Sequence, residues 1–548
     1  MGIVTDKHFK TNGRICFLGK KDALECFRKM QCNGNIPDFV AFLCDLKVCR
    51  EMVTSIKGIG IHMEIFKRAL DKDISIGSTL VDFYVSHGLF VEAHQVFEKL
   101  PCRNVVTWNV IISGYTKHEL GEQAIDCFNQ MQLDGIHPNR ATFIFVLKAC
   151  ICVASIDKGI EMHGEVARRG LEGDLLLGST LIDMYANSRS LAKAHEVFER
   201  VPIKSIISWT SLISGYAENG FGLEALKCFE NMGLHGVAPN NVTFICSLKA
   251  CGNIGSVEKV KEMHAEIAKC GWLERDVVVG NALVDAYAKC GFLWTARQIF
   301  KKLLTKDEVL WNMLLLGYVN HGYTEDVLVL FEQMQLEKVL PSSITFSCCL
   351  KVCGTLGAIQ KGQEMHHDIS KNGLLEGDPL LGNALIEMYA RCGFLLKAQE
   401  VFDNLFLKDC IVSWNALIFG YAEQGDWDKV HSLFDMMVYE ERISPDTVTF
   451  LSLLGACSHT GLIEKSYIYL RAMYDNYGIT PTLEHYACFI DILSRASQID
   501  MVVIFVEKIP FQPNCVLWHI VLNACRKLGH MELGKETFEH VMELNEMD

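Results

Sequence analysis

The sequence predicts an all-α protein, an α-solenoid of repeated helical hairpins, and three observations lead to that prediction. Four landmarks in the 548-residue chain recur with one period of about 102 residues. Each period divides into three units of 31 to 36 residues, and each unit has the apolar spacing of two short helices. A single hairpin of this size cannot bury its apolar face alone, so neighbouring hairpins must stack into a continuous core.

The period is visible in four kinds of residue. They are a Trp followed by Asn or Thr, a Gly-Ser-Thr or Gly-Asn-Ala triplet, a cysteine and a histidine, each recurring at steps of 101 to 104 residues. Chance does not place four independent landmarks on one period. Their first residues are Trp108, Trp209, Trp311 and Trp414; Gly77, Gly178, Gly280 and Gly382; Cys49, Cys150, Cys251, Cys353 and Cys457; and His62, His163, His264 and His366.

One unit shows how the sequence encodes a hairpin. From Trp209 onward, the apolar residues of 208–220 have the i, i+3, i+4, i+7 spacing of a helix face, and Gly220 ends the segment. The segment 223–232 repeats this pattern, and Pro239 breaks the chain before the next unit. Every unit is therefore expected to form a first and a second helix.

Composition restricts the function classes. The net charge is −14, half of the residues are hydrophobic and 22% are charged, which excludes a basic nucleic-acid tail, a collagen-like chain and a disordered chain. No apolar run is long enough for a membrane span, and the 23 scattered cysteines indicate buried, reduced thiols. The first 20 residues resemble neither a secretory signal nor an organellar presequence, so we expect a cytosolic protein or a sequence that begins inside a longer gene product.

The recurrent cysteines and histidines do not predict a zinc site. Cys49 and His62 are thirteen residues apart, one on each helix of a hairpin, and no C-x-x-C pair accompanies them. The triplet from His530 to Glu532 has the H-x-E pattern of zinc deaminases, but no P-C-x-x-C pair follows it. The sequence therefore predicts no metal, no cofactor and no catalysis by this chain.

Three phrases identify a family. VVTWNVIISGY (105–115), ATFIFVLKACICVASIDKGIEMHGEV (141–166) and VVVGNALVDAYAKCGFLWTARQIF (277–300) closely resemble the P, L and S repeats of plant organellar pentatricopeptide repeat (PPR) proteins, PLS subclass. The resemblance covers the chain from about residue 20 to its end. It places L repeats at 39–73, 140–174, 241–276, 343–378 and 447–482, S repeats at 74–104, 175–205, 277–307, 379–410 and 483–514, and P repeats at 105–139, 206–240, 308–342 and 411–446.

The resemblance also implies an overall organisation. Residues 1–38 would form a degenerate N-terminal P-type repeat, 39–514 the tandem P-L-S array, and 515–548 part of a truncated E-type extension. The family's deaminase-like DYW domain would follow that extension, and the chain stops at Asp548. The repeats of this family form a right-handed superhelix with a concave groove, which is the architecture we expect here.

The function implied by the resemblance is sequence-specific binding of single-stranded RNA in a mitochondrion or chloroplast. The PLS subclass implies a site-recognition factor for C-to-U RNA editing, with the deaminase or another editing-complex protein supplied in trans. A role in splicing, stability or translation of a transcript stays open. The alternative from another class is a protein-binding scaffold of the tetratricopeptide type, although that family keeps a 34-residue period. No membrane partner is expected.

Resemblance assigns base reading to the fifth and last residues of each repeat, one base per repeat. Amides and hydroxyls can donate and accept at a base edge, and a carboxylate can accept from uracil N3–H. The competing interpretation is helix capping, because Ser, Thr, Asn and Asp are preferred N-caps; Leu43 and Ile144 at the fifth position of L repeats argue against capping alone. The pairs are Ser78 with Asn104, Asn109 with Asn139, Ser179 with Ser205, Thr210 with Asn240, Asn281 with Asp307, Asn312 with Ser342, Asn383 with Asp409, and Asn415 with Asp446.

The family's pairing rules imply a base for each pair. Ser or Thr with Asn implies adenine, Asn with Asp uracil, Asn with Ser cytosine, Asn with Asn a pyrimidine, and Ser with Ser a purine. With the L repeats unread, the expected RNA is 5′-A-Y-n-R-A-n-U-C-n-U-U. The base at Asn383 depends on whether Asp409 or Cys410 is the last reader of its 32-residue repeat.

A second feature favours RNA. A lysine occupies the ninth residue of four L repeats, one helical turn after the fifth and so on the same face, where it could contact phosphate. An exposed solubilising lysine is the alternative. The net charge of −14 opposes RNA binding unless the acidic residues lie on the second helices, as Glu224, Glu230, Glu325 and Glu332 would allow. The four lysines are Lys47, Lys148, Lys249 and Lys351.

Overall fold

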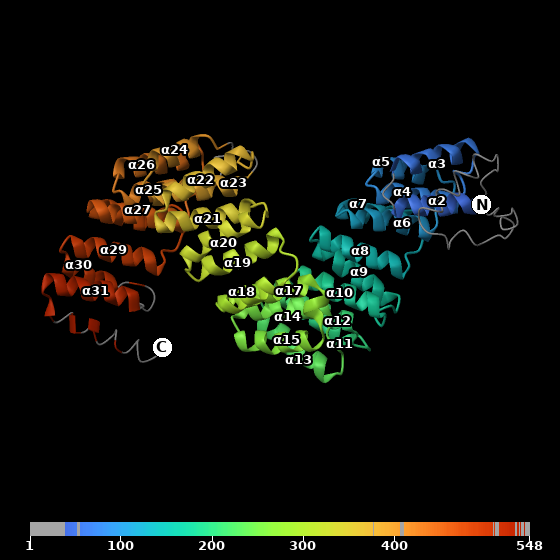
Figure 1. Cartoon of the computed structure of the whole chain (residues 1–548), viewed down its shortest axis with the longest axis horizontal. Coiled ribbons are helices and arrows are strands. Elements are labelled where there is room, and N and C mark those ends of the chain that lie inside the picture. The colour runs from blue at the N-terminus through green and yellow to red at the C-terminus, as the bar shows by residue number, and fades with distance from the viewer. Residues whose placement is uncertain are drawn as a thin grey trace. The chain divides into compact units, whose positions relative to one another are not determined.

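The computed structural model describes residues 39–51, 55–375, 378–405, 410–507, 509 and 515–531, together with 534, 535, 537, 538 and 542. Every regular element among these residues is a helix, which confirms the predicted all-α solenoid of hairpins. The chain divides into two compact units, 1–286 and 287–548, with the boundary inside one helix. Within each unit the hairpins follow one another in chain order (Figure 1).

The first unit alternates first and second helices. The first helices are α2 (Phe39–Glu51), α4 (Ile74–Ser86), α6 (Val105–Lys117), α8 (Arg140–Cys152), α10 (Leu175–Asn187), α12 (Ile206–Glu218) and α14 (Asn241–Ile254). The second helices are α3 (Ser55–Lys67), α5 (Phe90–Lys99), α7 (Gly121–Leu133), α9 (Ile156–Arg168), α11 (Leu191–Arg200), α13 (Gly222–Leu234) and α15 (Val257–Lys269), followed by the short α16 (Trp272–Arg275). The unit boundary lies inside α17 (Val277–Lys289).

The second unit continues the alternation. Its first helices are α19 (Glu308–Asn320), α21 (Ser343–Leu356), α23 (Pro379–Arg391), α25 (Ile411–Glu423), α27 (Thr447–Thr460), α29 (Leu483–Arg495) and α31 (Cys515–Leu528). Its second helices are α18 (Leu293–Lys302), α20 (Thr324–Leu336), α22 (Ile359–Lys371), α24 (Leu395–Asp403), α26 (Trp427–Asp435), α28 (Ile463–Asp475) and α30 (Ile499–Glu507). A π-helical turn, η2 (Met436–Glu440), extends α26.

In each unit the first helices form one continuous layer. Each first helix packs on the next, from α2 through α14 in the first unit and from α19 through α31 in the second. The second helices pack on their own first helix and in most hairpins on the following one, as α7 does on α8. In each unit the core therefore lies between the layer of first helices and the layer of second helices.

The periodic tryptophan joins each repeat that the sequence predicts to be of the S class to the following predicted P repeat. The ring of Phe97 in α5 meets Trp108 in α6 edge to face, with the ring centroids 4.7 Å apart. The same contact recurs with buried Trp209, Trp311 and Trp414 on Phe198, Phe300 and Phe402. Aromatic pairs of this geometry contribute about 0.5–1.5 kcal/mol beyond the area that they bury.

The periodic glycine is required by close packing. At Gly178 in α10 an added Cβ would lie 2.6 Å from a methyl carbon of Val201, at the end of α11. At Gly77 the corresponding distance, to Leu100, is 2.3 Å. The first helix of an S repeat therefore approaches the end of its second helix too closely for any side chain. Gly220 has another cause, because its φ of +84° lies in the left-handed region that favours glycine at a helix end.

The periodic cysteine and histidine have structural roles. The five periodic cysteines are buried as expected, whereas Cys102, Cys152 and Cys270, outside the periodic set, are exposed. Burial raises the pKa of Cys150 to about 11. His62 Nδ1 lies 2.7 Å from the hydroxyl of Tyr84, which joins an L repeat to the next S repeat. The bond recurs from His163 to Tyr185 and from His366 to Tyr389, each at 2.9 Å. Burial lowers the pKa of these histidines, which favours the neutral imidazole that can accept the bond.

The ends of the predicted domain organisation are described only in part. Residues 1–38, expected to form a degenerate repeat, lie outside the described residues. Within the expected extension 515–548, α31 packs on α29 and α30, and Leu517 and Val521 belong to the same apolar cluster as Phe489. The described residues include no helix that is long and apolar enough to cross a membrane.

Candidate nucleic-acid interface

The two predicted base-reading positions occupy different places on the first helices. The last residue of a repeat is the N-cap of the next first helix, as Asn139 is for α8 and Asp446 is for α27. The fifth residue lies inside the first helix, one turn from its start, as Asn109 does in α6. Capping is therefore a real function of the last residue, and it does not account for the fifth.

In three P repeats the structure brings the fifth and last residues into contact. Nδ2 of Asn109 donates to Oδ1 of Asn139 at 3.1 Å. Asn312 makes the equivalent bond to the hydroxyl of Ser342 at 3.1 Å, and Asn415 to Oδ1 of Asp446 at 3.0 Å. The members of each pair are about thirty residues apart in the chain, so the contact spans the boundary between two repeats.

A buried threonine, which the sequence analysis did not identify, holds each of these pairs. The hydroxyl of Thr142 donates to Oδ1 of Asn109 at 2.7 Å, and Thr345 and Thr449 bond Asn312 and Asn415 at 2.6 and 2.7 Å. These threonines also complete the capping box of the last residue. Because each amide oxygen accepts from a threonine, the amide nitrogen points to the last residue. A sequence signal existed, since Thr-Phe recurs at 142, 243, 345 and 449.

The fourth P-repeat pair is joined through its threonine. The hydroxyl of Thr210 lies 2.9 Å from that of Thr243, which in turn donates to Oδ1 of Asn240 at 2.8 Å. Thr210 also donates to the carbonyl oxygen of Ile206 in its own helix. The three side chains therefore form a chain of polar groups at the same place in the repeat as the three direct pairs.

In the S repeats the predicted serines bond differently. The hydroxyls of Ser78 and Ser179 donate to carbonyl oxygens of their own helices, at 2.6 and 2.9 Å. Their predicted partners, Asn104 and Ser205, are the N-caps of α6 and α12. Ser78 is partly exposed and keeps an acceptor lone pair that a donor on a base could use, whereas Ser179 is buried.

The other two predicted pairs in S repeats are Asn281 with Asp307, between which the described residues show no direct hydrogen bond, and Asn383 with Asp409. Asn281 lies in α17, and Asp307 caps α19 through a bond from the Leu310 amide. Asn383 lies in α23, and its Nδ2 is 3.5 Å from Sγ of Cys410, which occupies the N-cap position of α25. Asp409 lies outside the described residues. The geometry therefore favours Cys410 as the neighbour of Asn383.

The predicted lysine positions are all exposed on the first helices, at Lys47, Lys148, Lys249 and Lys351. Nζ of Lys249 lies 3.9 Å from a carboxylate oxygen of Glu218 in α12. An exposed pair of this kind contributes little to stability, but it places a negative charge beside a predicted phosphate contact.

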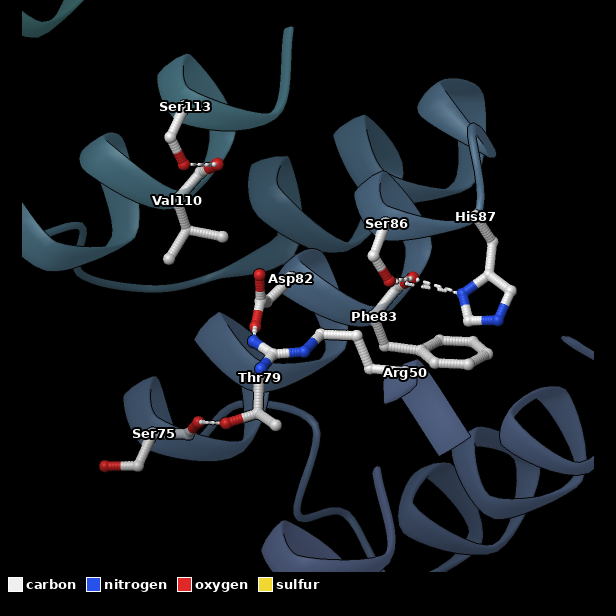
Figure 2. Close-up of polar contacts among 9 residues, drawn as sticks. All are labelled: Arg50, Ser75, Thr79, Asp82, Phe83, Ser86, His87, Val110 and Ser113. Carbon is white, nitrogen blue, oxygen red and sulfur yellow. Dashed lines mark hydrogen bonds and ion pairs between the residues drawn. The ribbon is translucent and has the colours of Figure 1, made fainter. Parts of the chain in front are cut away.

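Acidic residues occupy both helix layers, which the sequence analysis did not anticipate. Glu224, Glu230, Glu325 and Glu332 lie on the second helices α13 and α20 as expected. The ninth residue of each S repeat is also acidic, however, and this position lies on a first helix. Figure 2 shows one example, in which Arg50 of α2 forms an ion pair with Asp82 of α4. The others are Asp183, Asp285, Glu387 and Asp491.

The best-defined member of this acidic set is Asp183 in α10. Burial and the nearby Glu218 raise the pKa of its carboxyl group, while Lys148 opposes the shift. Along the first helices the charge of the ninth residue therefore alternates between a lysine in a predicted L repeat and a carboxylate in the next S repeat. The predicted P repeats carry an uncharged residue there, namely Ser113, Ser214, Leu316 and Phe419. This alternation lowers the positive potential available to RNA phosphates below that of the lysines alone.

The side chains at the fifth and last positions offer hydrogen-bond donors and acceptors, and the charged ninth residues lie in the same layer of first helices. No group of three or more His, Cys, Asp or Glu residues is placed to hold a metal ion in the described part of the chain. The polar groups at the repeat boundaries are amides, hydroxyls and carboxylates, which suit recognition of bases rather than chemistry on them.

Comparison with known families agrees with this geometry. The PPR repeat family profile matches residues 103–152, 204–253, 306–355 and 409–459. The PPR repeat profile matches residues 78–105, 281–307 and 383–410. The chain belongs to the PPR repeat family.

Curated PPR proteins of Arabidopsis thaliana align with nearly the whole chain. One is 33% identical over 523 residues, which is 95% of this chain and 71% of the relative. A mitochondrial relative is 32% identical, covering 97% of this chain and 77% of its own length. A chloroplastic relative is 31% identical over 96% of this chain, and the alignment spans 60% of its length. The chain is therefore clearly shorter than that relative.

Solved PPR structures share the fold. The maize pentatricopeptide repeat protein PPR10 superposes with a TM-score of 0.54 at 16% identity, covering 96% of this chain and 86% of that one. A second crystal structure of PPR10, in complex with an 18-nucleotide psaJ RNA element, gives a TM-score of 0.58, covering 93% and 80%. At this identity the likeness establishes the PPR solenoid fold.

Proposed function

We propose that this PPR protein binds single-stranded organellar RNA and reads its sequence with the fifth and last residues of its P and S repeats. The observation that carries the proposal is the set of three hydrogen-bonded pairs, Asn109–Asn139, Asn312–Ser342 and Asn415–Asp446. Each pair occupies the same place at a repeat boundary and presents a different combination of donors and acceptors. A protein that read one base per repeat would need this combination of constant position and variable chemistry.

The chemistry of the pairs supports different bases. In the Asn415–Asp446 pair, Oδ1 of the carboxylate is engaged by Asn415 and by the Thr449 amide, and Oδ2 remains to accept from uracil N3–H. In the Asn312–Ser342 pair a hydroxyl replaces the carboxylate, which suits the cytosine assignment. Asn383 with Cys410 has no carboxylate, so this neighbour weakens the uracil assignment at that repeat.

The finer part of the proposal is a role in C-to-U editing. The alternation of hairpins with 31, 35 and 36 residues supports a PLS array over 39–514, and the segment from 515 supports an E-type extension. The protein would select the editing site, and a deaminase would act in trans, because no P-C-x-x-C pair of a zinc site follows the H-x-E triplet at His530. Mitochondrial and chloroplastic relatives support an organellar location.

The experiment is a filter-binding titration of the full chain with RNA of sequence 5′-A-Y-n-R-A-n-U-C-n-U-U. Its controls are a scrambled RNA of the same composition and the corresponding DNA. Tighter binding of the designed RNA by about tenfold or more, equivalent to 1.4 kcal/mol, would support the proposal. Equal binding of the designed and scrambled RNAs would contradict base reading, and an absence of RNA binding would favour the protein-binding scaffold.

A further inference from the structure

A pocket on the second helices has chemistry that RNA reading does not use. A cavity of about 320 Å³ lies between α18 and α20. Phe300, Trp311, Leu330 and Leu336 form its apolar part. Its polar lining consists of three cations, Arg297, Lys301 and Lys306, one carboxylate, Glu337, and the amide of Gln333. This volume is at the low end of the range for ligand pockets, which suits a single side chain rather than a large cofactor.

The charge of this pocket is peculiar to one repeat. Residues 287–306 contain five Lys or Arg residues and no carboxylate, in a chain whose net charge is −14. Lys301 is the ninth residue of α18, and the ninth residues of the equivalent helices α5, α11 and α24 are Glu98, Glu199 and Asp403. The three sibling repeats therefore carry a negative charge where this repeat carries a positive one.

The equivalent repeat at α11 shows which ion pair is lost when the carboxylate at this position is replaced by a lysine. There Lys204 pairs with Glu199 at 2.7 Å, so the cation that follows the helix is neutralised by the helix itself. Lys306 follows α18 as Lys204 follows α11, but it pairs instead with Glu337 of the next repeat, at 3.0 Å. In α18 the ammonium group of Lys301 thus stands where the sibling helix has a carboxylate.

The cations of the pocket differ in their partners. Arg297 lies 3.9 Å from a carboxylate oxygen of Asp326, and Lys306 is paired with Glu337. Lys301 is exposed and has no carboxylate partner among the described residues. Lys301 is therefore the cation of this lining without a carboxylate partner in the described part of the chain, and it lines the same cavity as Phe300 and Leu330. This combination suits a carboxylate adjacent to an apolar side chain.

We propose that this pocket docks an acidic, leucine-containing segment of a protein partner. A carboxylate of the segment pairs with Lys301, and a neighbouring apolar side chain enters the cavity against Phe300 and Leu330. An RNA strand that follows the base-reading residues passes along the first helices, whereas this pocket opens between second helices. The aromatic and aliphatic side chains beside Lys301 suit a peptide that carries both a carboxylate and an apolar side chain. The carboxylate of Glu337 in the same lining disfavours a phosphate group. The proposal is independent of RNA reading.

The test uses a fluorescein-labelled peptide of alternating glutamate and leucine, titrated with the full chain and followed by fluorescence anisotropy. Lys301→Glu gives α18 the charge of its siblings and should weaken binding by about tenfold or more, which corresponds to 1.4 kcal/mol. Lys302→Glu makes the same charge change at the adjacent exposed position, outside the pocket lining, and should weaken binding by less than about threefold. Unchanged thermal unfolding of both variants shows that neither effect comes from misfolding.

Two further measurements separate the alternatives. A peptide with serine in place of leucine should lose most of its affinity, because nothing would fill the cavity. Excess unlabelled single-stranded RNA should leave the peptide bound. Equal losses of affinity in the two lysine variants, displacement of the peptide by RNA, or an absence of saturable binding would each overturn the proposal.

Discussion

Asn415 donates a hydrogen bond from Nδ2 to Oδ1 of Asp446, 31 residues further along the chain, at 3.0 Å. The same Asp446 oxygen accepts from the Thr449 amide and so caps α27. Helix capping and base reading are therefore compatible roles of one side chain. The capping interaction fixes the carboxylate in place, so a base that bound to it would cost less conformational entropy than one bound by a mobile side chain.

The first prediction is that two substitutions change the base that one repeat prefers. Thr210→Asn with Asn240→Asp recreates the Asn415–Asp446 pair at the boundary between α12 and α14. We expect preference at that position to change from adenine to uracil, with a difference of about 1–3 kcal/mol, the scale of a bidentate base contact. Filter binding to two RNAs that differ only at that nucleotide measures the change.

The reverse exchange is its matched control. Asn415→Thr with Asp446→Asn should move the preference of the other repeat from uracil to adenine. If both double variants bind the A and U forms of their RNAs as the parent does, and differ only in thermal stability, then the two positions serve capping alone.

The second prediction concerns the threonine that orients the pair. Thr449→Val removes the hydroxyl that donates to Asn415, so the amide loses its fixed orientation. We expect the unfolding free energy to fall by about 1–3 kcal/mol, since a buried polar atom is left without its partner, together with reduced discrimination at one nucleotide. Urea unfolding and RNA titration measure the two effects separately. Thr447→Val, at an exposed position of the same helix, should change neither.

The third prediction concerns the lysines. Replacing Lys47, Lys148, Lys249 and Lys351 by Gln should weaken binding to all single-stranded RNAs alike. The slope of log affinity against log salt should fall by about 0.7 for each lysine that touches a phosphate in the parent protein. Lys227→Gln, on the second helix α13, is the control and should leave the slope unchanged. An unaltered slope in the fourfold variant would show that these lysines only solubilise the protein.

The acidic neighbours allow a test in the opposite direction. Glu218 lies 3.9 Å from Lys249 and also contributes to the raised pKa of Asp183. Glu218→Gln should therefore strengthen RNA binding, and most clearly at low salt, where surface charges are least screened. No change in affinity at low salt would mean that the RNA does not approach Lys249.

The fold could be predicted from the repeat pattern. The hydrogen-bonded pairs of fifth and last residues, and the threonines that hold them, became visible only in the structure. Trp209 recurs because it fills a fixed volume between two hairpins, and Gly178 recurs because the two helices of its own hairpin meet too closely for a side chain. Such packing is repeated in each hairpin. The contact between Asn415 and Asp446 depends instead on how one repeat is rotated against the next. Sequence spacing places both residues at the repeat boundary and leaves that rotation undetermined.

The arrangement of lysines and carboxylates on the first helices could not be predicted either, because it also depends on how neighbouring repeats pack. Helix periodicity placed Lys148 on the face of the fifth residues, and it places Asp183 on the equivalent face of the next helix. Lys148 and Asp183 are 35 positions apart in the sequence and become neighbours only when α8 and α10 pack. Net charge alone could not show this alternation.

The last prediction concerns Asp45, a buried carboxyl group whose Oδ2 has no partner among the described residues. The equivalent L-repeat residues are Val146, Ser247, Cys349 and Leu453, all buried. Burial raises the pKa of Asp45 from 3.8 to about 7. Between these values the folded state binds the extra proton, so stability should fall as pH rises from 4 to above 7, by roughly 2–4 kcal/mol. Asp45→Val should remove this pH dependence in urea unfolding at pH 5 and 8; an equal pH dependence in parent and variant would contradict the assignment.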